Sequence, residues 1–161
     1  MTESMLDEQA LFKHLPELEG QLGVEHVKPL LERFSLRALA DGEVLVRDQA
    51  PIDALYLVLE GSLRLSIEFG NHAIQLGEIG SGNWVGELGY FSGVRLASST
   101  ATAVGECEIA RLSYQDFDAL LDEDSVAVCR LTHGFIQMLM RRLAVTANNP
   151  VIDPRGEMQI G

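Results

Sequence analysis

The sequence lacks most of the features that mark secreted and membrane proteins. Its 161 residues include only two cysteines, Cys107 and Cys129, which are too few for a disulfide framework and are typical of a reduced cytoplasmic protein. No stretch approaches the roughly 20 consecutive apolar residues that a membrane span requires. The acidic start of the chain, residues 1–10, lacks the basic residues and apolar core of a signal peptide. We therefore expect one cytoplasmic domain that has no membrane partner.

Basic residues are also scarce. Twelve lysines and arginines stand against 24 aspartates and glutamates, which gives a formal net charge of −12. A protein that binds nucleic acid needs a basic face to displace counterions from the phosphates. The charge therefore predicts no nucleic-acid partner, and its field also opposes any anionic ligand.

Common catalytic motifs are missing as well. The sequence has no Gly-x-Ser-x-Gly, no Walker loop and no Cys-x-x-Cys. Its four histidines (His14, His26, His72 and His133) lie far apart, whereas a metal-dependent β-barrel enzyme needs two closely spaced histidines and a carboxylate. We expect no enzyme, no metal and no cofactor. A small metal-dependent β-barrel enzyme is kept as an alternative, which a metal analysis would test.

The apolar pattern divides the chain into three parts. Residues 1–34 show apolar positions at helical spacing, interrupted by Pro16 and Pro29, which predicts short helices. From residue 35 to 113, short apolar runs alternate with Gly, Asn and Asp turns, which predicts the strands of an antiparallel sandwich or barrel. Residues 114–122 and 125–147 again read as helices, with Ser125 as the N-cap of the longer one. Residues 148–161 read as a flexible tail.

One segment carries a recognisable motif. It reads Gly86-Glu87-Leu88-Gly89-Tyr90-Phe91, followed by Arg95-Leu96-Ala97-Ser98-Ser99. This segment resembles the phosphate-binding cassette of the cyclic-AMP receptor protein (catabolite activator) family and of the wider cyclic-nucleotide-binding domains. Residues 53–62, 107–114 and 140–146 resemble three further units of that family, in the right order. The resemblance implies an antiparallel β-roll of jelly-roll type with N-terminal helices and a long C-terminal helix.

The resemblance also implies a ligand site for cAMP, cGMP or a related small molecule. Gly86 would let the backbone approach the ligand, Glu87 would accept from the ribose 2′-hydroxyl, and Leu88 would open a short helix facing the phosphate. Ser98 or Ser99 would bind a phosphate oxygen. On the long helix, Thr146 would reach the purine and Arg142 would lie near Glu87.

The family has a phosphate-binding arginine for which this sequence has no direct equivalent. When Gly86-Glu87-Leu88 is aligned with the start of the cassette and Cys107-Glu108-Ile109 with the end of the family's last strand, no gap is left. This register places Ala97 at the position of the arginine. Arg95 lies two residues earlier, so on a strand it would share a face with Ala97 and could reach the phosphate. It could equally be a solvated loop charge. The remaining positions also have simpler readings: Glu87 as a helix-dipole partner, the serines as ordinary strand residues and Arg142 as a favourable charge near a helix end.

These features predict a regulatory sensor module that signals through its C-terminal helix. The apolar stripe Leu131, Phe135, Met138 and Leu139 predicts a homodimer through the helix from Val126 to Thr146, unless the stripe packs on its own barrel. A protein effector would read the signal. Only about fifteen residues follow Thr146, too few for the family's helix-turn-helix domain. The alternative is a degenerate module that binds no ligand and serves as a dimerisation or docking scaffold.

Overall fold

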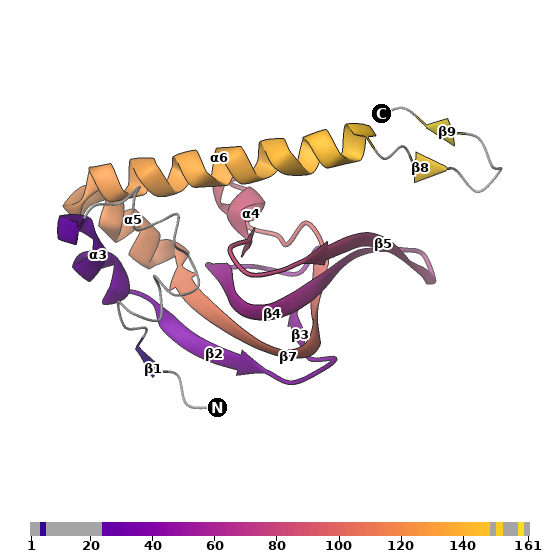
Figure 1. Ribbon diagram of the computed structural model, residues 1–161, viewed down its shortest axis with the longest axis horizontal. Helices are drawn as coiled ribbons and strands as arrows, with labels where there is room; N and C mark the ends of the chain where they lie inside the picture. The colour runs from indigo at the N-terminus through magenta and orange to yellow at the C-terminus, as the bar shows by residue number, and fades with distance from the viewer. Residues whose placement is uncertain (1–3, 6–23, 149–150, 153–157, 160–161) are drawn as a thin grey trace.

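The core of the molecule is one rolled, antiparallel β-sheet. The computed structural model describes residues 4–5, 24–148, 151–152 and 158–159. Seven strands of that part of the chain form the sheet (Figure 1): β1 (Ser4–Met5), β2 (Ser35–Leu39), β3 (Val44–Val46), β4 (Ala54–Phe69), β5 (His72–Ile79), β6 (Trp84–Val85) and β7 (Thr100–Ser113). The predicted fold class, mainly β with flanking helices, is confirmed.

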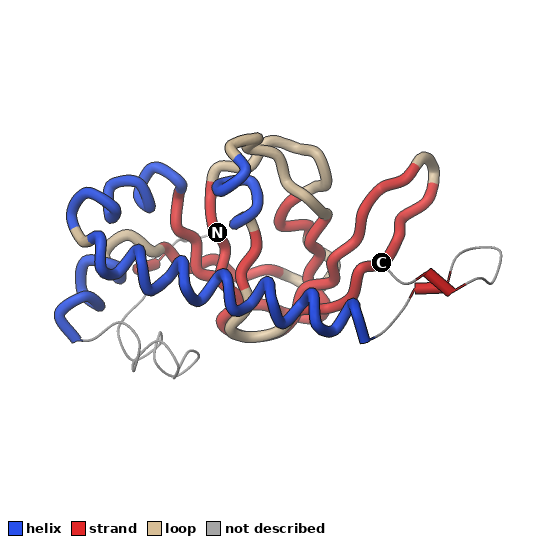
Figure 2. The backbone as a smooth tube through the Cα atoms, turned by 90° about the horizontal axis from the view of Figure 1, so that it is seen from above, coloured by secondary structure: helices blue, strands red, loops and turns tan. Residues whose placement is uncertain are grey.

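Two long strands hold the sheet together. β4 and β7 pair from Ala54 opposite Ser113 to Ser66 opposite Thr100, with register shifts on either side of Glu60. β2 and β3 pair with β7, and β5 and β6 pair with β4. The apolar residues of β4 from Ala54 to Leu59 are all buried, because the strand runs through the core at this point. The hairpin of β4 and β5 projects from one end of the roll (Figure 2).

Within the described residues, four helices lie around the roll: α3 (Val24–Leu31), α4 (Glu87–Ser92), α5 (Tyr114–Glu123) and α6 (Ser125–Asn148). α3 contains Pro29 without ending there, and the other predicted N-terminal helical residues, 9–23, lie outside the described residues. α6 lies across the roll, with α3 and α5 beside its first turns and α4 beneath its middle (Figure 1). In the predicted tail, β8 (Val151–Ile152) pairs with β9 (Met158–Gln159). Within the described part of the chain, no helix is both long and apolar enough to cross a membrane.

The long helix is capped one residue earlier than the sequence predicted. Asp124, not Ser125, takes the N-cap position: its Oδ1 accepts from the Ala127 N–H at 3.2 Å and its carbonyl accepts from the Val128 N–H. Its other carboxylate oxygen lies 2.6 Å from Nδ1 of His26 on α3. An ionised aspartate in contact with two elements is a stronger cap than an exposed serine hydroxyl.

The apolar stripe that predicted a dimer is buried within the chain itself. Leu131, Phe135 and Met138 are 2%, 1% and 3% exposed, because this face of α6 packs inside the chain, where Phe135 contacts rings of β6, α4 and α5. Their assignment to a dimer interface is therefore wrong. A second stripe on the other side of α6 is exposed, at spacings of three and four residues: Val126, Cys129, His133, Ile136, Met140 and Leu143. We call these six residues the exposed seam.

Candidate functional site

The cassette segment joins β6 to β7 and begins with a turn that only glycine fits. Gly86 precedes α4 with a φ of +100°, in the left-handed region. A Cβ added there would collide with the carbonyl oxygen of Ala54. Tyr114, the first residue of α5, donates its hydroxyl to the Gly86 carbonyl at 2.6 Å. Burial raises the pKa of Tyr114 to about 12, so the phenol keeps the proton that it donates. This bond fixes the start of α4 against α5.

Glu87, the first residue of α4, is a buried carboxylate. Its side chain is 3% exposed, and Oε1 lies 3.3 Å from Nη1 of Arg142 on α6. Oε2 is buried and has no hydrogen-bond partner. Desolvation raises the pKa of Glu87, although a backbone hydrogen bond and Arg142 oppose the shift. The structure thus brings together the two residues that the resemblance placed side by side, and leaves one buried acceptor atom open.

Further contacts bind the same stretch of α6 to the cassette. Arg142 Nη2 donates to the Trp84 carbonyl at 3.0 Å. One turn earlier, Met138 Sδ accepts from the Trp84 N–H at 3.3 Å. The Trp84 ring meets the Phe135 ring edge-on, with centroids 4.9 Å apart. Any shift of α6 must therefore disturb Trp84 and Glu87. No sequence pattern indicated Met138 as a partner of Trp84, because a thioether contact depends on how two distant segments pack.

The remaining cassette residues differ in exposure. Ala97 is 4% exposed, and its backbone is held by hydrogen bonds to Gln49 and Ala50. Leu88 and Ser98 are exposed, and Ser99 is half-buried. Thr146 lies in the last turn of α6, where the structure describes the helix but not that side chain. The structure therefore places a small buried methyl group at position 97, which the sequence register aligns with the family's arginine.

Arg95 does not share a strand face with Ala97, so that expectation is wrong. Its φ of +61° is left-handed, which turns the side chain away from the direction that an extended strand would give. The guanidinium carbon lies over two aromatic rings, 4.6 Å from the centroid of Tyr114 and 5.1 Å from that of Tyr90. Tyr90 in turn donates to Asp118 on α5. Arg95 therefore joins the cassette loop to α4 and α5 by cation–π contacts.

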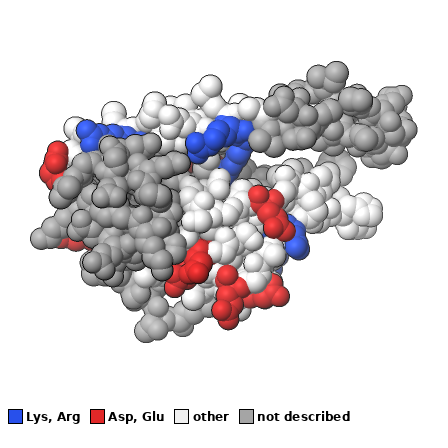
Figure 3. Space-filling model, in the orientation of Figure 1, with Lys and Arg blue, Asp and Glu red and all other residues white. Residues whose placement is uncertain are grey.

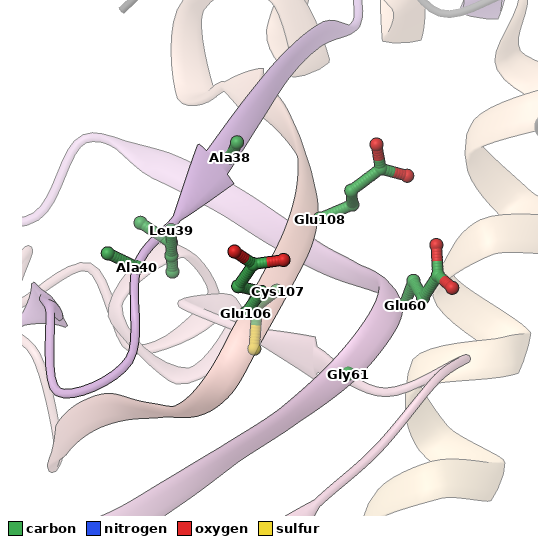
Figure 4. A pocket seen from close by; sticks show the side chains of 8 residues that line it. All are labelled: Ala38, Leu39, Ala40, Glu60, Gly61, Glu106, Cys107 and Glu108. Carbon is green, nitrogen blue, oxygen red and sulfur yellow. The ribbon is translucent and has the colours of Figure 1, made fainter.

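A hollow of about 790 Å³ opens on the sheet between β2, β4 and β7. None of the cassette residues lines it. Its rim includes three carboxylates, of which Glu60 and Glu108 face each other across β4 and β7 (Figure 4). On the face shown in Figure 3, most acidic side chains lie over the strands and most basic ones lie along α6, although a basic patch also lies beside acidic side chains over the strands. Among the described residues, no three histidines, cysteines or carboxylates are grouped so that they could hold a metal ion.

The β-roll, the glycine turn and the buried glutamate are features that this chain shares with one protein family. The chain belongs to the cyclic nucleotide-binding domain family, whose model matches residues 36–124. It is similar to the cAMP-activated global transcriptional regulator CRP of Salmonella typhimurium, with 29% identity over 132 residues, or 78% of this chain and 60% of that protein. The chain thus spans well under the full length of that relative.

The fold is also similar to those of solved structures, two of which illustrate the likeness. A cyclic nucleotide-binding domain from Methylobacillus flagellatus superposes with a TM-score of 0.77 at 19% identity, over 91% of this chain and 86% of that one. The c-di-GMP-responsive global regulator CLP of Xanthomonas campestris gives a TM-score of 0.70 at 26% identity, over 76% of this chain and 60% of that one. The same roll therefore serves regulators that respond to different nucleotides.

Proposed function

We propose that this chain is a regulatory sensor in which a small ligand of the nucleotide type binds at Glu87 and changes the position of α6. The contact between Glu87 and Arg142 carries the proposal, because it joins the ligand-binding segment directly to the output helix. A ligand hydroxyl that donates to Glu87 adds to or replaces the Arg142 contact. A ligand that binds more tightly when α6 is in one position than in the other then shifts the equilibrium between these two positions. The cassette residues Gly86, Leu88, Ser98 and Ser99 would line the ligand, and Thr146 would approach it from α6.

The exposed seam of α6 supports a homodimer. Its positions follow a repeat of three and four residues, the pattern of a two-stranded coiled coil. Leu143 is 69% exposed and Met140 is 64% exposed, which is unusual for large apolar side chains on one stripe. A second copy of the chain would cover this seam by twofold symmetry, and a ligand that moves α6 would then change the dimer or the surface that it offers to a protein effector.

A second candidate function is a scaffold that binds no ligand. The burial of Ala97 favours it, because the cassette then has no cation at the position of the family's arginine. In that case α6 and the roll would serve dimerisation or protein docking only. The two candidates differ in a single measurable property, the binding of any small molecule near Glu87.

The test is calorimetric titration of the full chain with a panel of cAMP, cGMP, cyclic di-GMP and unphosphorylated ribonucleosides. Trp84 is the only tryptophan of the chain and contacts both Met138 and Arg142, so its fluorescence reports on the position of α6 relative to β6. We expect at least one compound to bind and to change that fluorescence, and Glu87→Gln to weaken both effects. If none of the panel binds the native protein, the scaffold function replaces this one.

A further inference from the structure

The cassette is built around an acceptor that lacks a donor. Glu87 is 2% exposed as a residue, and its Oε2 has no hydrogen-bond partner. A buried acceptor left unpaired costs free energy, which a ligand hydroxyl group would recover on binding. The atom is therefore suited to a hydroxyl donor, and a carboxylate acceptor makes such a bond stronger than a neutral one.

The same cassette offers little to an anion. The two arginines that it brings together are both engaged: Arg142 with Glu87 and the Trp84 carbonyl, and Arg95 with the rings of Tyr90 and Tyr114. Release of Arg95 would cost its two cation–π contacts. At the remaining position, Ala97 contributes a methyl group.

The electric field at the site also disfavours a phosphate. The open oxygen atom belongs to the carboxylate of Glu87 itself, and the chain as a whole carries a formal charge of −12. A cyclic phosphate would bring a further negative charge beside this carboxylate, away from water and without a free cation in the described cassette. An uncharged ligand avoids this cost and still supplies the hydroxyl groups.

We infer that the ligand of this site is an uncharged, hydroxyl-bearing molecule of the ribonucleoside class, and not a cyclic nucleotide. The inference rests on the proposed function, since it assumes that a ligand binds at Glu87. The ribose hydroxyls donate to Glu87, and the Ala97 side chain supplies no charge that would favour a phosphate. The site then prefers an uncharged nucleoside to its cyclic phosphate. An arginine at position 97 would give the opposite preference.

The experiment compares adenosine, guanosine, 2′-deoxyadenosine, cAMP and cGMP on the native chain by calorimetry, with Trp84 fluorescence as the second reading. We expect a ribonucleoside to bind roughly tenfold to a hundredfold more tightly than its cyclic phosphate, and the 2′-deoxy compound to lose a similar factor. Glu87→Gln should remove the difference between adenosine and 2′-deoxyadenosine. This comparison needs no variant at position 97, so it stands even if such a variant fails to fold.

Ala97→Arg supplies the converse test. We expect it to favour cAMP by roughly tenfold or more over the native chain. Val94→Arg is the matched control, because it adds the same charge at an exposed position in the same loop. Native binding of cAMP that is tighter than that of adenosine would overturn the inference and leave the proposed function standing. Binding of none of the five compounds to the native chain would overturn both.

Discussion

Nη1 of Arg142 lies 3.3 Å from Oε1 of Glu87, and this contact joins two segments that are 55 residues apart in the chain. Glu87 is almost fully buried, whereas the Arg142 side chain is 31% exposed. The pair is therefore asymmetric: the arginine can turn to solvent, but the carboxylate cannot. Loss of the arginine should cost more than loss of the acid.

Arg142→Met should destabilise the fold, because it leaves a buried carboxylate without its charge partner. Removal of one member of a buried pair costs roughly 3 kcal/mol, and the exposure of Arg142 places the expected value at or below that figure. Glu87→Gln with Arg142→Met should recover most of the loss. Urea denaturation of the two single variants and the double variant measures the coupling. Arg141→Met, at the exposed neighbour, is the control, and an equal loss in it would contradict the role of the pair.

Glu87 should make the stability of the protein depend on pH. Burial raises its pKa in the folded state, so the folded chain holds this proton more tightly than the unfolded chain. The resulting contribution is full below the unfolded pKa and is lost as pH rises through the folded one. Glu87→Gln should therefore gain stability relative to the native chain as pH rises toward neutrality. Denaturation curves over that range measure the trend, and Glu106→Gln, at an exposed site, should show none.

The contribution of Arg95 to stability should separate into a backbone part and a side-chain part. Arg95→Ala loses the cation–π contacts to Tyr90 and Tyr114, worth about 0.5–1 kcal/mol, and keeps the left-handed strain. Arg95→Gly loses the same contacts and relieves a strain of roughly 1 kcal/mol. The glycine variant should therefore unfold at higher urea concentration than the alanine variant. Equal stabilities would show that the left-handed conformation of Arg95 is not strained. A loss of cAMP affinity in both would favour the phosphate contact that the sequence suggested.

The stability that the N-cap of α6 contributes should also depend on pH, in the direction opposite to that of Glu87. Burial opposes ionisation of Asp124, but its hydrogen bonds with His26 and with the Ala127 N–H outweigh burial and lower its pKa. Its contribution is therefore present above its unfolded pKa and is lost as pH falls through the folded one. Asp124→Ala should cost about 1 kcal/mol at neutral pH and less in acid. Ser125→Ala, at the residue that the sequence suggested as the cap, should cost little in the same denaturation assay.

The exposed seam predicts a dimer that can be detected by a disulfide between the Cys129 side chains of the two copies. In a parallel two-stranded arrangement, equivalent seam positions of the two copies face each other, so Cys129 should lie opposite its counterpart. Mild oxidation should then yield a covalent dimer, which Cys129→Ser abolishes, while the buried Cys107 serves as the internal control. Leu143→Glu with Met140→Glu should give a folded monomer by light scattering. A native chain that is monomeric at micromolar concentrations would refute the dimer.

The sequence alone determined the class of the architecture and suggested where a site would lie. Period-two apolar runs with glycine turns between residues 35 and 113 predicted an antiparallel sandwich or barrel. The resemblance carried by the Gly86-Glu87-Leu88 motif then implied a β-roll with its candidate site at that segment. The spacing from that motif to Cys107 also placed Ala97 where the resemblance has an arginine. Such features are local in the chain, so their patterns can be read without knowledge of distant contacts.

Tertiary structure decided which groups meet. Whether Leu131 or Leu143 faces the roll depends on how α6 is rotated about its axis, and both stripes have the same helical spacing. The direction of Arg95 depends on one left-handed residue that no pattern encodes. The open oxygen atom of Glu87 depends on how far Arg142 reaches across 55 residues of chain. Packing sets these relations because side chains far apart in sequence compete for the same buried space.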